Sequence, residues 1–223
     1  MRQYGTRQKR QHPSEIAEGI WLWSAAYDET FFNSYLVQTD EDQSVLVDPL
    51  FYTLDGEPLA NWSDFDSLPK PQAIWLTNSD HERDSRLFQK HFHIPLEVAK
   101  PETRLMSAKA DRFFKDGDSL PGGWQVIELQ DQKTPTECVF YHQERQLLIV
   151  GDALLSQADG RLRRPYDEPA YTDEQKAQQG LQTLADLPVT GVLVGHGDPV
   201  FSHSKAWLRD ALEKDPRSIS NNQ

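Results

Sequence analysis

Short apolar runs bounded by polar or turn residues recur along the whole chain, and their order predicts the class of fold. The runs are rich in Val, Ile, Leu and aromatic residues, which is typical of β-strands. We expect strands at residues 19–23, 33–39, 44–49, 73–77, 123–129, 137–142, 146–152 and 190–197.

Amphipathic helices are expected after the strand runs. A first helix follows residues 73–77, with Ser79 or Asp80 as its N-cap. Thr172 begins a capping box for a second helix, and a third is expected at residues 204–214. Because strands come in runs and helices follow each run, the order predicts an α+β protein. In such a protein, two sheet-containing halves stack with the helices outside.

Length and composition predict the domain organisation and exclude several classes. The chain has 223 residues, and we expect one domain at residues 16–215, between a flexible basic tail at 1–15 and a flexible C-terminal tail at 216–223. No apolar run approaches the ~20 residues of a membrane helix, and the first residues lack the apolar core of a secretory signal. The one cysteine, Cys138, cannot form an internal disulfide, so we expect a cytoplasmic protein with no membrane partner. A net charge of −12 disfavours nucleic acid as a partner, and the oligomeric state stays open.

Polar residues follow four of the expected strands, at the ends where open sheets place their ligand sites. Asp48 follows the third run and TNSDHER, at residues 77–83, follows the fourth. Gly-Asp lies at residues 151–152, and Gly-His-Gly at residues 195–197. In this order the residues resemble the motifs of the metallo-β-lactamase fold superfamily, over about residues 19–207. The resemblance implies a four-layer αββα sandwich and a dinuclear zinc hydrolase.

The family's ligand pattern is only partly present. The family has T-H-x-H-x-D-H after the fourth strand, a His before T-P, an Asp in G-D and a His in G-H-G. Thr77, Asp152 and His196 match this pattern. The other ligand positions hold Asn78, Asp80, Glu82, Arg83 and Lys133. The resemblance therefore implies a degenerate metal site and disfavours two zinc ions, because Asn, Arg and Lys do not bind zinc.

The first hypothesis for this site is that Lys133 replaces a metal as the internal cation. A unit charge about 4 Å from a divalent ion repels it by roughly 8 kcal/mol at an effective dielectric of ~20. A complete structural zinc site contributes about 10 to 16 kcal/mol, so a protonated Lys133 would oppose much of the binding. Its ammonium group is expected among the carboxylates of Asp152, Asp80 and Glu82.

The alternative hypothesis keeps a single metal ion. Asp80, Asp152 and His196 are ligand types, and His81, at an unspecified position of the pattern, could join them. The set is rich in oxygen, which favours manganese, iron or magnesium over zinc. The expected cofactor is therefore either none or one divalent metal, with zinc, manganese and iron as the candidates.

Two functions follow from these hypotheses. The first is a hydrolase that uses metal-activated water on a small ester, thioester, lactone or phosphoester, with Asp152, Lys133 and Glu82 as catalytic candidates. The second is a catalytically inactive, metal-free member of the superfamily that binds a small anionic ligand or a protein partner in the same crevice. The candidates for contacting a ligand are Asn78, Arg83, Arg161 and Arg164. Arg161 and Arg164 also fit a solvated turn paired with nearby acidic residues.

Overall fold

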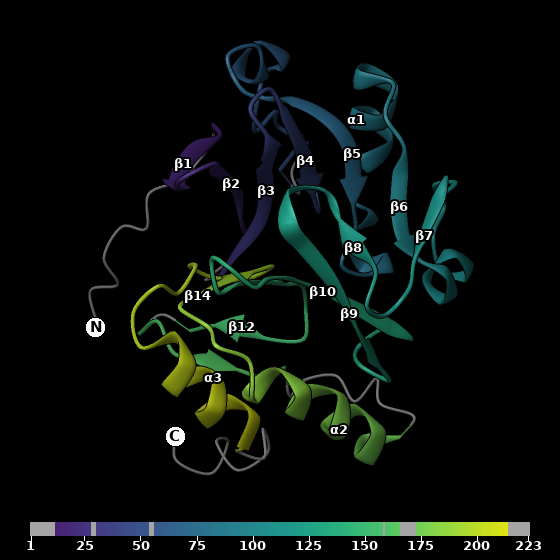
Figure 1. Ribbon diagram of the computed structural model, residues 1–223. Coiled ribbons are helices and arrows are strands. Elements are labelled where there is room, and N and C mark those ends of the chain that lie inside the picture. Colours follow the sequence, from purple (N-terminus) through teal and green to yellow (C-terminus); the bar gives the residue numbers. More distant parts are fainter. Residues whose placement is uncertain (1–11, 28–29, 54–55, 158, 166–172, 214–223) are drawn as a thin grey trace.

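Two β-sheets packed against each other form the centre of the protein (Figure 1). The computed structural model describes residues 12–27, 30–53, 56–157, 159–165 and 173–213. Most of the two predicted tails lies outside these residues, so the domain limits stay a prediction. Strand β1 begins at Ser14, inside the predicted N-terminal tail.

The first sheet has seven strands that lie side by side in chain order. They pair antiparallel from β1 to β4 and parallel from β4 to β7. Their bounds are β1 Ser14–Ala17, β2 Ile20–Tyr27, β3 Thr30–Asp40, β4 Gln43–Val47, β5 Lys70–Trp75, β6 Leu96–Ala99 and β7 Arg112–Phe114.

The second sheet has five strands in the order β14-β11-β10-β9-β8. Only the β11–β14 pair is parallel in this sheet. Its strands are β8 Ser119–Leu120, β9 Trp124–Gln130, β10 Thr136–His142, β11 Leu147–Val150 and β14 Gly191–Val194. A separate two-stranded ribbon joins β12 (Leu155–Ser156) to β13 (Leu162–Arg163).

The helices cover the outer faces of the two sheets. They are α1 Ser85–Phe92, α2 Glu174–Ala185 and α3 Ser204–Glu213. Phe88 of α1 packs into the outer core of the first sheet. Helices α2 and α3 lie side by side below the second sheet in Figure 1, and Leu181 and Leu208 pack into its outer core.

A central core joins the inner faces of the two sheets. It contains Leu22 and Tyr35 from the first sheet, and Phe140 and Leu193 from the second, all nearly inaccessible to solvent. Each of these strands overlaps one of the predicted apolar runs, because helices or the other sheet cover both faces of each sheet. The layers are therefore helix, sheet, sheet and helix, which confirms the predicted α+β class and αββα sandwich.

Each predicted apolar run overlaps a strand, but the predicted helix caps need correction. Ser79 and Asp80 do not cap α1; they belong to a separate 3₁₀ turn, η2 (Ser79–Glu82), and α1 begins after Asp84. Asp84 has another role, because its carboxylate accepts hydrogen bonds from a neighbouring loop.

The N-cap of α2 is Asp173, whose side chain accepts a hydrogen bond of 3.0 Å from the backbone N–H of Lys176. The predicted cap, Thr172, lies outside the described residues. Helix α3 begins at Ser204, as predicted, and residue 214, the predicted last residue, lies outside the described residues.

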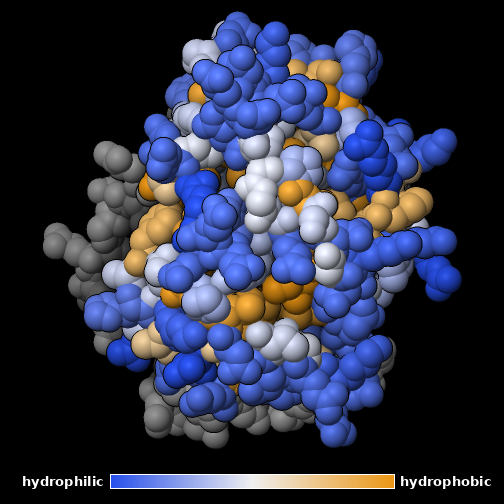
Figure 2. Space-filling view, viewed as in Figure 1, coloured by the Kyte–Doolittle hydropathy of each residue, from blue (hydrophilic) through white to orange (hydrophobic). Residues whose placement is uncertain are grey.

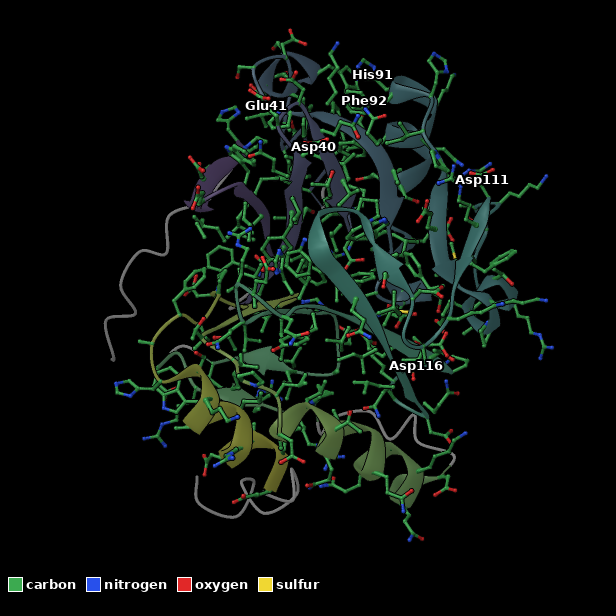
Figure 3. All side chains as sticks on the ribbon, in the orientation of Figure 1. Asp40, Glu41, His91, Phe92, Asp111 and Asp116 are labelled. Carbon is green, nitrogen blue, oxygen red and sulfur yellow. The ribbon has the colours of Figure 1, made fainter. Side chains whose placement is uncertain are left out.

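Exposed acidic side chains lie in the loops at the ends of several strands. Figure 3 labels Asp40 and Glu41 at the turn between β3 and β4, and Asp111 and Asp116, which precede and follow β7 in the chain. The face in Figure 2 is mostly hydrophilic, with apolar patches near its centre. No helix within the described ranges is long and apolar enough to span a membrane.

Candidate metal centre

Three side chains that can bind a metal meet where strands of both sheets end. His81 lies in η2, shortly after β5, whereas Asp152 and His196 follow β11 and β14. The Oδ1 atom of Asp152 lies 3.3 Å from Nε2 of His81 and 2.9 Å from Nε2 of His196. The two Nε2 atoms are 3.4 Å apart. One carboxylate oxygen and two imidazole nitrogens therefore face the same point.

Two glycines make this close approach possible. A Cβ atom on Gly195 would lie 2.7 Å from Cε1 of His81. A Cβ atom on Gly151 would collide with the side chains of Glu137 and Thr77. The glycines of the Gly-Asp and Gly-His-Gly motifs are thus required because a side chain at either position would push the site apart.

The spacing of the three atoms fits one metal ion. A triangle with sides of 2.9, 3.3 and 3.4 Å has a circumscribed circle of about 1.9 Å radius, so a point about 1 Å above its plane lies about 2.1 Å from every corner. That distance is usual for zinc bound to imidazole or carboxylate. The spacing of the ligand atoms therefore fits a single divalent ion.

Asp48 fixes the orientation of the His81 ring. Nδ1 of His81 lies 2.8 Å from Oδ2 of Asp48, and Thr77 donates hydrogen bonds to both oxygens of this carboxylate, at 2.9 Å from its backbone N–H and 2.8 Å from its hydroxyl. A carboxylate that accepts from the far nitrogen of a ligand histidine is a common feature of metal sites. It leaves Nε2 of His81 directed at Asp152 and His196.

The charges of the two imidazoles differ. Burial and the charge of Arg83 lower the pKa of His81, but the carboxylates of Asp152 and Asp48 outweigh both and raise it to about 9. Burial lowers the pKa of His196 despite its contact with Asp152. The pKa of Asp152 is well below its usual range, because the two histidines outweigh the effect of burial. Without a metal, His81 is therefore a cation between two carboxylates.

Lys133 occupies the other side of Asp152. Its Nζ atom lies 2.9 Å from Oδ2 of Asp152 and 3.1 Å from Oδ2 of Asp80. Burial lowers the pKa of Lys133, but Asp152 and Asp80 outweigh it and raise the pKa above its usual range, so the ammonium stays charged. The predicted contacts of Lys133 with Asp152 and Asp80 are confirmed. Asp152 thus gives one oxygen to the imidazoles and the other to the ammonium.

Glu82 is not part of this cluster, so its predicted place beside Lys133 is wrong. Its carboxylate accepts hydrogen bonds from the backbone N–H groups of Ser107 and Ala108, at 2.7 and 2.8 Å, and from the hydroxyl of Ser107. The reason is the η2 turn, in which Asn78 accepts a hydrogen bond of 3.1 Å from the N–H of His81. This turn directs His81 inward and Glu82 outward. The cap Asn78 was the sequence signal for this turn.

Asn78 lies in the interior, away from the predicted ligand position. Its amide donates to both carboxylate oxygens of Glu137, at 3.1 and 2.9 Å, and both residues are fully buried. Glu137 also accepts a hydrogen bond of 2.8 Å from the N–H of Asp152. Burial, with a further effect of Asp152, raises the pKa of Glu137 well above its usual value. Glu137 was not among the predicted site residues, although an acidic residue within an apolar strand indicates that its carboxylate has a buried polar partner.

A pocket of about 300 Å³ opens over the cluster. Its lining residues are Ala25, Phe32, Leu50, Tyr52, Asp80, His81, Arg83, Lys133, Asp152 and His196. Arg83 lies in this lining, as predicted, but its Nη1 atom donates to the backbone oxygens of Asn33 and Asp48. Its backbone has a positive φ of 42°, a strained conformation for a residue with a side chain. Arg83 therefore links the η2 turn to the backbone of Asn33 and Asp48. Its contact with a ligand stays a prediction.

The other two predicted ligand arginines do not line the pocket. Arg161 is exposed and pairs with Asp159 at 3.5 Å. Arg164 is buried and donates a hydrogen bond of 2.5 Å to the side chain of Gln178 on α2. The prediction that these two arginines contact a ligand in this pocket is therefore wrong, because Arg164 is directed towards α2 and Arg161 towards solvent.

Fold and site together define an αββα protein with a metal-capable cluster at the shared end of its two sheets. The sequence profile described as the metallo-beta-lactamase superfamily matches residues 18–214, and the chain belongs to this superfamily.

A curated relative and two solved structures agree with this assignment. The probable metallo-hydrolase YqjP of Bacillus subtilis (strain 168) is 26% identical over 135 residues, which are 52% of this chain and 41% of that protein. The chain thus matches less than half of that relative. A metallo-beta-lactamase from Pontibacter korlensis has a TM-score of 0.70 at 15% identity, over 92% of this chain and 99% of that one. A beta-lactamase domain protein from Burkholderia ambifaria has a TM-score of 0.66 at 18% identity, over 91% and 74%. At these identities the structures show the fold alone.

Proposed function

We propose that the protein is a hydrolase with a single divalent metal, acting on a small ester, thioester, lactone or phosphoester. The observation that carries this proposal is the spacing of 2.9 to 3.4 Å between the ligand atoms of His81, Asp152 and His196. Membership of a superfamily of hydrolase type supports it. The site lies under a pocket, as a catalytic centre requires.

His81, Asp152 and His196 would hold the ion, and two imidazoles with one carboxylate suit catalytic zinc as well as iron(II). The ion would supply Lewis-acid activation of water and of the scissile group. Asp48 holds His81 in the required orientation through the hydrogen bond to Nδ1. Lys133 places a positive charge on the pocket wall, where it can stabilise negative charge developing on a substrate oxygen. Asp80 positions this ammonium.

A second candidate, a metal-free protein that binds a small anionic ligand or a protein partner, is favoured by the charge balance. The carboxylates of Asp48, Asp80 and Asp152 already contact the cationic groups of His81 and Lys133. Such a cluster is stable without an ion, because each buried charge has a partner.

Metal content and activity together distinguish the two candidates. Protein purified without added metal should contain about one equivalent of zinc, manganese or iron, and hydrolyse members of a panel of small esters, thioesters, lactones and phosphoesters. His196→Ala should lose the metal and the activity, whereas His203→Ala, which changes an exposed histidine directly before α3, should keep both. Less than a tenth of an equivalent, with no uptake from added metal salts, would contradict the proposal and favour the metal-free candidate.

A further inference from the structure

We propose that the substrate is an uncharged acyl compound, and that its hydrocarbon chain binds to an apolar wall formed by Ala25, Phe32, Leu50 and Tyr52. This inference rests on the proposed function and narrows its substrate class to carboxylic esters, thioesters and lactones. Hydrolysis of an ester or thioester adds one water across the acyl C–O or C–S bond and releases a carboxylic acid with an alcohol or thiol. Hydrolysis of a lactone adds one water across its acyl C–O bond and opens the ring to a hydroxy acid.

The apolar wall adjoins the candidate metal centre directly. The ring of Phe32 packs edge-on against the ring of His196, with 4.5 Å between their centroids. Phe32 is also joined to His196 by an isolated backbone bridge. Phe32 packs onto a small core that contains Ala25 and Leu50. An acyl carbon at the centre would therefore have its chain against this wall, and the charged residues on its other side.

Hydrogen bonds to the backbone hold the wall in place. Ser34 accepts a hydrogen bond of 2.9 Å from the N–H of Leu50, and Trp23 donates one of 2.7 Å to the Leu50 carbonyl. Asp84 accepts from the N–H groups of Phe51 and Tyr52, at 2.8 and 3.0 Å. Because these partners lie on β2, β3 and at the start of α1, the wall has a fixed position. A fixed wall limits the length of the chain that it accepts.

The size and chemistry of the pocket favour a short acyl chain. A volume of about 300 Å³ is at the lower end for ligand pockets. Ala25 and Leu50 are buried, so Phe32 and Tyr52 provide most of the accessible surface of the wall. Aromatic surface gains free energy by covering hydrocarbon and gains none by facing a charged phosphoryl group. Tyr52 is 38% exposed, more than the other residues of the apolar wall, so it lies where the wall meets solvent. We infer that a short acyl chain covers the wall as far as Tyr52.

The test uses acyl thioesters of N-acetylcysteamine from acetyl to octanoyl, with the matching alkyl esters and γ-lactones as separate arms. For the metal-loaded protein, we expect kcat/KM to rise about fourfold per methylene to a maximum within this series and then to fall. Tyr52→Ala opens the end of the wall and should move the maximum at least two carbons towards longer chains. Phe113→Ala removes another exposed aromatic, 45% exposed on β7, and should leave the maximum unchanged.

A binding measurement separates this inference from the proposed function. Calorimetric titration with the amides from acetamide to octanamide, which need no hydrolysis, should show the same dependence on chain length and the same change in Tyr52→Ala. Chain-dependent amide binding without hydrolysis would overturn the proposed function and keep the apolar wall. Hydrolysis with a flat dependence on chain length, or a maximum that Tyr52→Ala does not move, would overturn the wall. Hydrolysis confined to phosphoesters would overturn the acyl substrate class.

Discussion

Asp152 shows how one side chain can serve two different cations. Its Oδ1 atom faces the imidazoles and its Oδ2 atom faces Lys133. The alternatives of a lysine and a metal ion beside Asp152 are therefore both compatible with the geometry. Placing the Lys133 ammonium beside Asp152 costs no translational entropy, because the ammonium is covalently attached to the chain.

The contribution of Lys133 can be measured as stability. Lys133→Ala, in protein treated with chelator, leaves the buried Asp152 with fewer partners and should lower the free energy of unfolding by about 2 kcal/mol. Urea denaturation measures this change. The control is Lys176→Ala on α2, whose side chain is 53% exposed and 3.8 Å from Asp131, and which should change stability by less than about 0.5 kcal/mol. Equal effects in the two variants would show that the Lys133 contacts contribute nothing specific.

At the scale of the elements, the longer strands were predictable, whereas most short strands and the turns of the site were not. Runs such as residues 33–39 and 137–142 identify strands because they carry β-forming side chains that are mostly buried. The strands that were not predicted have at most four residues, too few for a periodic pattern; they are β1, β6, β7, β8, β12 and β13. The position of His81 depends on the Asn78 cap and on the pairing of Asn78 with Glu137, which are 59 residues apart. A family pattern aligned by position could not contain this information.

The close packing at the end of β14 gives a second prediction. Gly195→Ala would place a methyl group 2.7 Å from Cε1 of His81 and 3.1 Å from the backbone oxygen of Gly151. It should lower the free energy of unfolding by about 1–3 kcal/mol, because neither the buried ring nor the backbone can move freely. It should also weaken metal binding, measured by competition with a chromogenic chelator. The matched control is Gly180→Ala in α2, where the added Cβ meets only ordinary contacts from 3.7 Å, and which should raise stability by about 0.5–1 kcal/mol. A destabilised control or an unaffected Gly195→Ala would contradict this account of the packing.

At the scale of the whole molecule, a bound metal should stabilise the fold. At a free concentration one hundred times the Kd, a ligand of the native state adds about 2.7 kcal/mol, which corresponds to a rise in Tm of roughly 5–10 °C for a chain of this size. Calorimetric scans with metal and with chelator measure this difference. His196→Ala should abolish it. A difference below about 1 °C in protein that binds one equivalent would mean that the unfolded chain holds the ion equally well.

The three candidate ligands follow strands of both sheets, and an ion held by them would therefore change the entropy of the unfolded chain. His81 follows a strand of the first sheet and His196 follows a strand of the second, and they are 115 residues apart in sequence. An ion held by both would close a loop of this length, and for a loop of about 100 residues a cross-link is worth about 4–5 kcal/mol in the chain-entropy model. The chain has one cysteine and cannot form an internal disulfide. The metal would thus act as a reversible cross-link, formed and removed by the supply of the ion rather than by oxidation and reduction.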